Sequence, residues 1–163
     1  MSSETAFDLI VIGTGTAGST AAAECRTKGW RVAIIDSLPF GGTCALRGCE
    51  PKKILLEAAK IVDSNKSHEN KGISDSKAIH IKWPNLIRFK GTFTDSFLKQ
   101  REDSYYNLGI VPFHGHARFI CPSTIRVEND GEGVDGKGNI IMEGKHVLIA
   151  TGSKPAYLNS RGI

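Results

Sequence analysis

The first forty residues show two apolar runs separated by a glycine turn and an alanine-rich stretch. Residues 7–12 (FDLIVI) are almost continuously apolar, as expected of a strand that is buried on both faces of a parallel sheet. The alanine-rich stretch that follows ends at Gly29, and glycine commonly terminates helices. Residues 30–36 (WRVAIID) form the second apolar run. The pattern therefore predicts a strand, a helix and a second strand, which is the start of a βαβ unit.

The rest of the chain predicts helices first and short strands afterwards. A helix is expected to begin near Pro51 and continue as KKILLEAAKIV, because proline suits the first turn of a helix. A surface loop, a short helix and an amphipathic helix closed by Gly109 are predicted at residues 64–77, 83–89 and 94–108. Strands are predicted at residues 110–113, 117–120, 124–128, 139–143 and 146–150, with a turn-rich segment (NDGEGVDGKGN) at 129–139. The predicted fold class is α/β, with a parallel sheet and a small antiparallel β meander.

Composition and charge describe an ordinary globular chain of about one domain. It has 163 residues, of which 40% are hydrophobic, and this is sufficient for a buried core. Its net charge of +4 is spread along the sequence, which argues against a nucleic-acid partner. No apolar stretch approaches the length of a membrane span, and the amino end lacks the features of a signal peptide. We therefore expect a soluble, cytoplasmic protein without a membrane partner.

The glycine turn has the spacing of a dinucleotide-binding motif. Gly13, Gly15 and Gly18 (GTGTAG) fit G-x-G-x-x-G, and Asp36 follows at the end of the second predicted strand. Gly13 would permit a tight turn, and Gly15 would let backbone amides approach a pyrophosphate at the helix N-terminus. Asp36 would accept hydrogen bonds from a ribose. A tight turn without a ligand is the alternative, which the strand, the helix and the acidic residue together disfavour. The motif alone does not separate FAD from NAD.

Two of the four cysteines, Cys44 and Cys49, lie five residues apart in GGTCALRGCEPKK, residues 41–53. In a regular helix this spacing is too wide for a disulfide, so the two can pair only where the backbone is irregular. The neighbouring glycines supply that freedom. We therefore expect a glycine loop that runs into a helix N-terminus. Its partial positive charge, with Arg47, Lys52 and Lys53 nearby, is expected to favour a thiolate at one of the two sulfurs.

Three interpretations of the cysteine pair compete. Zinc needs about four ligands, and neither Cys25 in the alanine-rich stretch nor Cys121 beside Pro122 lies at a useful spacing. A purely structural bridge over so short a loop would add little stability. Redox exchange is therefore favoured. His114 and His116 are two residues apart without an evident acidic or cysteine partner, so packing or solvent exposure is favoured there and no metal site is predicted.

GGTCALRGCEPKK closely resembles the redox-active disulfide signature of the class I pyridine nucleotide-disulfide oxidoreductases. This is the family of glutathione reductase, dihydrolipoamide dehydrogenase and mercuric reductase. The resemblance extends to GTGTAG at residues 13–18, GHARF at 115–119 and ATGSKP at 150–155, and so spans nearly the whole chain. It implies that residues 1–163 are the N-terminal part of a Rossmann-like FAD-binding domain that carries the redox disulfide.

The resemblance also implies roles for individual residues. The FAD contacts would come from Gly13, Gly15 and Gly18 at the pyrophosphate, Asp36 at the adenosine ribose, Gly42 and Thr43 against the cofactor, Ala117 beside the adenine, and Thr151 and Gly152 in a turn beside the FAD. Cys49 would exchange electrons with the flavin, and Cys44 would be the interchange thiol that attacks the substrate. Lys52 or Lys53 would approach flavin N5. Electrons would pass from NAD(P)H to FAD, then to the Cys44–Cys49 disulfide, then to a small-molecule or protein disulfide.

The chain departs from the family pattern beside the cysteines and in its extent. Residues 45–47 read Ala-Leu-Arg where relatives have an apolar residue, asparagine and another apolar residue, and Glu50 replaces an apolar residue. These charges argue against transferring the substrate of any one member. The sequence ends at Ile163, before the family's NAD(P)-binding and dimerisation domains, so we expect a fragment that is inactive alone and a homodimeric parent. A non-catalytic FAD- or nucleotide-binding module, or a thiol switch, is the alternative function.

Overall fold

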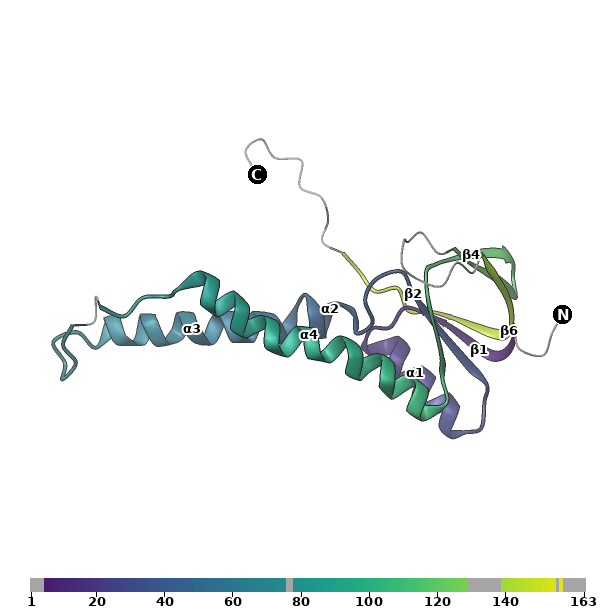
Figure 1. Ribbon diagram of the computed structural model, residues 1–163, viewed down its shortest axis with the longest axis horizontal. Helices are drawn as coiled ribbons and strands as arrows, with labels where there is room; N and C mark the ends of the chain where they lie inside the picture. Colours follow the sequence, from purple (N-terminus) through teal and green to yellow (C-terminus); the bar gives the residue numbers. More distant parts are fainter. Residues whose placement is uncertain (1–4, 76–77, 129–138, 155, 157–163) are drawn as a thin grey trace.

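The computed structural model is an α/β fold and describes residues 5–75, 78–128, 139–154 and 156. Within those residues, six strands form a single sheet in the order β3-β2-β1-β6-β5-β4. The strands are β1 (Ala6–Ile12), β2 (Val32–Asp36), β3 (Val111–His114), β4 (His116–Cys121), β5 (Thr124–Glu128) and β6 (Ile140–Ile149). The pairs among β3, β2, β1 and β6 are parallel, whereas β6, β5 and β4 pair antiparallel. This confirms the predicted α/β class with a parallel sheet and an antiparallel part (Figure 1).

The central strands are apolar because the parallel part of the sheet is covered on both faces. On one face, Val11 and Ile34 pack with Ala22 of helix α1 (Thr16–Thr27) and with Tyr105 of helix α4 (Trp83–Leu108). The other face packs against side chains of the antiparallel strands, in a cluster of Phe7, Ile10, Ala33, Ile35, Ile125, Val127 and Met142. The βαβ prediction is therefore confirmed in type and order. Strand β2 begins at Val32, two residues later than predicted.

Two predicted boundaries are wrong, and in both cases a glycine lies inside a continuous element. The strands predicted at residues 139–143 and 146–150 form one strand, β6, because Gly144 pairs with β1 and its missing side chain leaves room for Ile10. The helices predicted at residues 83–89 and 94–108 form one helix, α4. There the rings of Phe89 and Phe93 pack edge to face across Gly91, with centroids 5.2 Å apart. Each element therefore continues through its glycine despite the weak intrinsic propensity of that residue type.

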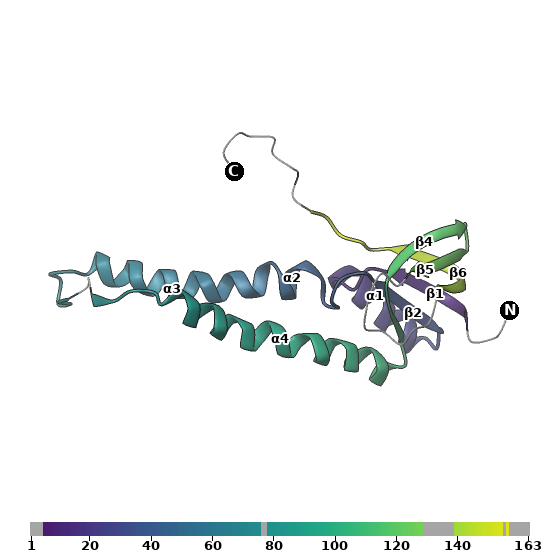
Figure 2. The ribbon, with the colours of Figure 1, turned by 45° about the horizontal axis from the view of Figure 1, so that its top comes forward.

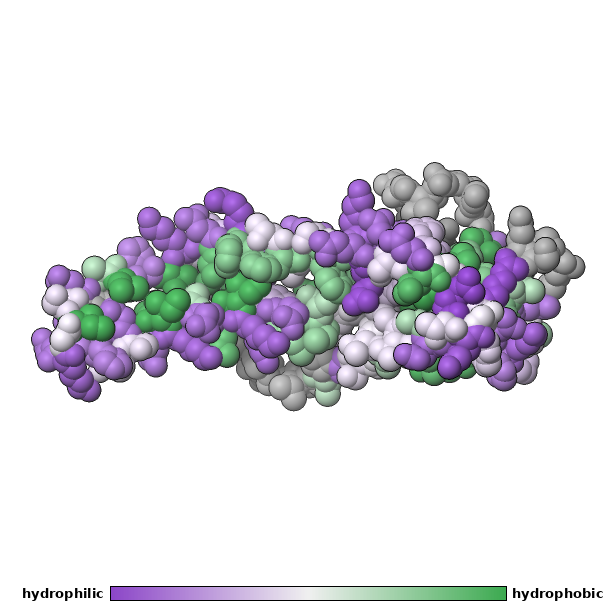
Figure 3. All heavy atoms as spheres, turned by 90° about the horizontal axis from the view of Figure 1, so that it is seen from below, coloured by the Kyte–Doolittle hydropathy of each residue, from purple (hydrophilic) through white to green (hydrophobic). Residues whose placement is uncertain are grey.

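Helices α3 (Cys49–Ser67) and α4 lie side by side and project away from the sheet as a helical arm (Figures 1 and 2). Helix α3 runs to Ser67, so the beginning of the loop predicted at residues 64–77 is helical. Helix α4 ends at Gly109, which has φ of +73° as a C-terminal glycine commonly does. Many apolar side chains remain exposed along the arm, as the green areas in Figure 3 show. They include Leu56, Ile61, Trp83, Phe89 and Phe93.

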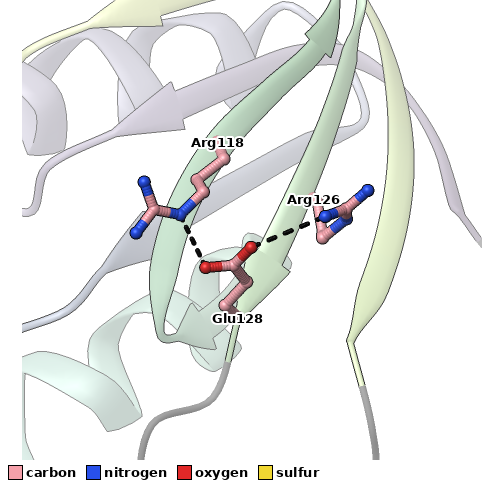
Figure 4. Close-up of polar contacts among 3 residues, drawn as sticks. All are labelled: Arg118, Arg126 and Glu128. Carbon is pink, nitrogen blue, oxygen red and sulfur yellow. Dashed lines mark hydrogen bonds and ion pairs between the residues drawn. The ribbon is translucent and has the colours of Figure 1, made fainter.

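The antiparallel edge of the sheet is held by an ion-pair cluster on its surface. Arg118 of β4 lies directly across from Arg126 of β5, which places two positive charges side by side. Glu128 lies between them, with its carboxylate 2.6 Å from Arg118 Nε and 3.6 Å from Arg126 Nη1 (Figure 4). The hydrogen bond from Arg118 is the main reason that the pKa of Glu128 is lowered. The turn predicted at residues 129–139 lies outside the described residues apart from Asn139.

Candidate functional site

A cavity of about 450 Å³ opens at the carboxyl ends of β1, β2 and β6. In α/β sheets this is the edge at which ligands bind. Most of the residues proposed from the sequence line this cavity: Gly13, Gly15, Asp36, Gly42, Thr43, Cys44, Ala117, Thr151 and Gly152. Four others lie elsewhere: Gly18 is buried beneath the first turn, and Cys49, Lys52 and Lys53 lie in the first turn of α3. Pro155, the last residue of the ATGSKP segment, lies outside the described residues.

The three glycines of the first βα turn are required for different reasons. Gly13 has φ of +109°, and a Cβ atom there would collide with the Ala150 carbonyl. A Cβ on Gly18 would collide with the carbonyl of Gly13, so packing of the turn explains both residues. Gly15 is different: its backbone is extended, and no atom lies within 4 Å of the position that a Cβ would take. A side chain there would instead project into open space at the N-terminus of α1, beside the cavity. That space fits a pyrophosphate, which helix N-termini bind well.

Asp36 lies in the cavity wall, and its carboxylate is already bonded to the neighbouring chain. Its Oδ2 atom accepts hydrogen bonds from the backbone amide of Thr14 at 2.8 Å and from the Thr14 hydroxyl at 2.6 Å. Its Oδ1 atom accepts one from the amide of Leu38 at 3.0 Å. A carboxylate offers about four acceptor positions, so one remains for a ribose hydroxyl. The carboxylate therefore has a structural task in the turn in addition to the predicted one.

The two cysteines lie at the junction of two helices. Cys44 belongs to the short helix α2 (Gly42–Leu46), Gly48 breaks the helical backbone, and Cys49 is the first residue of α3. Both cysteines are free and exposed, and a hydrogen bond joins the two thiols. The irregular backbone predicted between them is therefore confirmed, and it brings their side chains together. Of the two, Cys44 lines the cavity in the part of the chain that the structure describes.

The pKa of Cys44 is raised, so Cys44 does not support the prediction of a thiolate at one of the two sulfurs. The main cause is the hydrogen bond with Cys49, followed by partial desolvation and by the negative charge of Glu50. Lys53 acts in the opposite direction, but its Nζ atom is 3.0 Å from a carboxylate oxygen of Glu50. Glu50 therefore offsets Lys53, which is one of the three basic residues named in the prediction. The same contact raises the pKa of Lys53, while Lys52 has no ionic partner among the residues the structure describes.

Helix α2 is pressed against the first βα turn, and this places Cys44 in the cavity wall. Gly41 and Gly42 have φ of +131° and +70°, values that side chains other than glycine rarely adopt. A Cβ on Gly42 would lie 2.5 Å from the Cα of Gly15. The glycine pair of the cysteine segment is thus fitted directly to the glycine turn of the dinucleotide motif. Two motifs that are separate in the sequence form one site.

Sequence reasoning missed two groups around this site. Thr14 is 1% exposed and bonds both Asp36 and the amide of Gly41, but a threonine between two glycines gives no signal of that role. The sequence showed no evident acidic partner for His114, but the structure provides one: its Nε2 atom is 3.4 Å from Glu102 of α4. The His114 ring also stacks on Phe40, with centroids 3.9 Å apart. These partners come from segments that are distant in the sequence, so no local pattern indicates them.

Two further searches cover the described residues only. No three histidine, cysteine, aspartate or glutamate side chains in these ranges come together as a potential metal site. Among the same residues, no helix is long and apolar enough to cross a membrane.

Comparison with known proteins identifies the kind of protein in which such a site occurs. The family model described as pyridine nucleotide-disulphide oxidoreductase matches residues 7–163. Glutathione reductase from Schizosaccharomyces pombe is 31% identical over 152 residues, which are 93% of this chain and 32% of that relative. Dihydrolipoyl dehydrogenase from Mycoplasma pneumoniae is 31% identical over 156 residues, 96% of this chain and 32% of that relative. The chain thus spans about a third of the length of these curated relatives.

Proposed function

Because the chain belongs to the pyridine nucleotide-disulphide oxidoreductase family, we propose that it forms the FAD-binding and dithiol-bearing part of an FAD-dependent disulfide oxidoreductase. One observation supports this most strongly: Cys44, whose thiol is hydrogen-bonded to that of Cys49, lines the same cavity as the dinucleotide motif. The open space beside Gly15 fits the pyrophosphate, and Asp36 retains an acceptor position for the ribose. FAD, when bound, supplies two-electron transfer to a neighbouring sulfur.

The chain's own part in the proposed reaction is thiol–disulfide exchange. The Cys44 sulfur, once deprotonated, attacks one sulfur of an acceptor disulfide, which forms a mixed disulfide and releases one thiol. The Cys49 sulfur then attacks Cys44 Sγ, closes the Cys44–Cys49 disulfide and releases the second thiol. Two protein thiols are oxidised and one external disulfide is reduced. Restoring the dithiol would take two electrons and two protons: NAD(P)H would supply a hydride by way of FAD in the full-length protein, and solvent would supply the second proton.

The assignment of roles to the two sulfurs is part of the proposal. Cys44 as the interchange thiol would need access from the acceptor, and Cys49 would need access from the flavin. Position in the cavity wall instead favours Cys44 as the sulfur nearer the cofactor. The first assignment agrees with the family resemblance, and the two assignments differ in an observable way. A thiolate beside oxidised flavin gives a long-wavelength charge-transfer absorbance, so whichever cysteine lies nearer the flavin is needed for it.

The proposal is tested by loading the chain with FAD and comparing Cys44→Ser and Cys49→Ser after limited reduction. We expect flavin absorbance in all three proteins and two titratable thiols gained when the oxidised wild type is reduced. Loss of the charge-transfer absorbance in Cys49→Ser alone supports the roles given above. Loss in Cys44→Ser alone reverses them. Bound FAD without any change in thiol count would indicate the non-catalytic nucleotide-binding module, and failure to bind FAD would contradict the proposal.

The electron donor, the acceptor and the assembly are proposed for a protein as long as the relatives, not for residues 1–163 alone. We propose NAD(P)H as the electron donor, a small-molecule or protein disulfide as the acceptor, and a homodimer as the assembly. A glutathione reductase and a dihydrolipoyl dehydrogenase are each 31% identical to this chain in sequence, so sequence similarity does not favour the substrate of either relative as the acceptor. We expect negligible NAD(P)H-dependent turnover from residues 1–163 alone.

A further inference from the structure

Thr14 connects three parts of the site through one buried hydroxyl. It follows Gly13 at the end of β1, and 1% of it is exposed. Its hydroxyl donates to Asp36 Oδ2 at 2.6 Å and accepts from the backbone amide of Gly41 at 3.1 Å. Gly41 immediately precedes the helix that carries Cys44. The end of β1, the end of β2 and the start of the cysteine segment therefore meet at this hydroxyl.

We propose that Thr14 is a positioning residue that fixes helix α2 against the first βα turn and so holds Cys44 within reach of Cys49. Asp36 orients the Thr14 hydroxyl: because the hydroxyl proton points to the carboxylate, a lone pair of the hydroxyl oxygen is directed to the Gly41 amide. This task is separate from any contact that Asp36 makes with a ribose. The inference rests on the proposed function, since it concerns the geometry of the same cysteine pair.

The Gly41 amide depends on this hydrogen bond because its surroundings are closed. Gly41 is buried, and the ring of Phe97 from α4 lies 2.8 Å from the position that a Cβ would take there. The same residue has φ of +131°, so the backbone holds an unusual conformation at that point. Without the threonine hydroxyl, a buried amide would lose its acceptor, and the segment would shift to satisfy it. Helix α2 follows directly and would move with it.

Movement of α2 would be observed in the thiol–disulfide equilibrium. Closing an intramolecular disulfide depends on how much of the time the two sulfurs are in contact, which is their effective concentration. The measurement is the equilibrium of the Cys44–Cys49 pair with reduced and oxidised glutathione, quenched by alkylation and read by peptide mass. In this reaction the protein dithiol and one oxidised glutathione give the protein disulfide and two reduced glutathiones, so atoms and electrons balance.

Three variants separate positioning from general destabilisation. Thr14→Val removes the hydroxyl and keeps the shape, and Thr14→Ser keeps the hydroxyl. Thr94→Val removes a second buried threonine hydroxyl, which bonds within α4 and not to Gly41. We expect Thr14→Val to lower the equilibrium constant for oxidation by about tenfold, on the scale of one buried unsatisfied amide. We expect Thr14→Ser and Thr94→Val to stay within about twofold of wild type, even where Thr94→Val lowers the free energy of unfolding.

The outcomes distinguish this inference from the proposed function. An unchanged equilibrium in Thr14→Val, an equal fall in Thr94→Val, or no recovery in Thr14→Ser would overturn the positioning role alone. If Thr14→Val does not fold, Asp36→Asn tests the same contact, because it weakens the acceptor of the hydroxyl and leaves Thr14 in place. A smaller fall is expected there, and no fall would overturn the inference. A wild-type pair that glutathione cannot oxidise would overturn the proposed function and this inference together.

Discussion

The sheet and the helical arm differ sharply in how much side chain they bury. In the sheet, Ile34 and its neighbours in the central strands are fully buried. In the arm, the 19 residues of α3 include one buried residue, Pro51, and the 26 residues of α4 include Thr94 and Tyr105. The candidate site is formed almost entirely by the sheet and its connecting turns, with α2 at the junction. The comparison indicates that packing of the sheet fixes the site, whereas the arm contacts it at few points.

The largest effect is expected from truncating an apolar side chain in the core of the sheet, with the same truncation in the arm for comparison. Ile34→Ala removes a side chain with 0% exposure from the core, which costs about 2 to 5 kcal/mol of unfolding free energy. Ile61→Ala in the arm, where the side chain is 58% exposed, should change it by no more than about 0.5 kcal/mol. Urea unfolding of both variants measures the difference. Similar losses in the two variants would show that the arm is as well packed as the sheet.

A second prediction compares alanine substitutions at two glycines with positive φ, only one of which leaves no room for a Cβ atom. Gly42→Ala places a Cβ 2.5 Å from Gly15 in the first βα turn, so the two motifs must move apart and FAD affinity should fall by more than about tenfold. Gly72→Ala, beyond α3 at the tip of the arm, also has positive φ but has no atom within 4 Å. It should cost about 1 kcal/mol of stability and leave FAD affinity unchanged. Titration with FAD, followed by flavin fluorescence, measures both. Equal affinities in the two variants would contradict the contact between the motifs.

The elements with a local cause were predictable from the sequence. Strands buried on both faces have continuous apolar runs, and β1 has such a run at residues 7–12. The glycine at residue 13 has a backbone conformation that only glycine adopts freely, so its spacing in the motif carries structural information. The irregular backbone expected between the cysteines lies at Gly48, between the end of α2 and the start of α3. For these features, the amino-acid type at one position is sufficient.

The features that were missed depend on how side chains and segments are oriented in the folded chain. Gly91 and Gly144 each lie inside a continuous element, so the helices and strands predicted on either side of them are joined. The raised pKa of Cys44 depends mainly on the hydrogen bond with Cys49, and Lys53, which would lower it, is bonded to Glu50. Thr14 has a role only because Gly41 folds back onto it.

A smaller effect is expected at the point where the arm touches the sheet. The ring of Tyr105 is buried against Phe40, and its hydroxyl lies 2.7 Å from Ser19 Oγ of α1. Tyr105→Phe keeps the ring and removes that hydrogen bond, so we expect a loss of about 1 kcal/mol. Tyr106→Phe is the control, because Tyr106 is 60% exposed. Removing its hydroxyl should change the free energy of unfolding by less than about 0.5 kcal/mol. Urea unfolding of both variants tests whether this contact joins the arm to the sheet.

The same residue gives a dependence on pH. Burial raises the pKa of Tyr105 above its value in the unfolded chain, which is about 10. The folded state then holds the proton more tightly, so the stabilisation is complete below the unfolded pKa and is lost as pH rises through the folded pKa. Wild-type stability should therefore fall more steeply above pH of about 10 than that of Tyr105→Phe. Identical alkaline slopes in the two proteins would exclude this contribution.

The smallest effect is expected at the exposed ion pairs of Glu128, on the surface of the antiparallel edge of the sheet. The hydrogen bond from Arg118 lowers the pKa of Glu128 below that of an unfolded glutamate, about 4.3. Its stabilisation is present above that unfolded pKa and is lost as pH falls through the folded pKa. Glu128→Gln should therefore lower Tm by only about 1 °C at neutral pH, with a flatter decline in acid and less difference at high salt. Glu57→Gln in the arm, which breaks a 3.8 Å pair with Lys60, should not change Tm measurably. A drop in Tm for Glu128→Gln as large as that for Ile34→Ala would show that surface charge, rather than burial, holds this half of the molecule together.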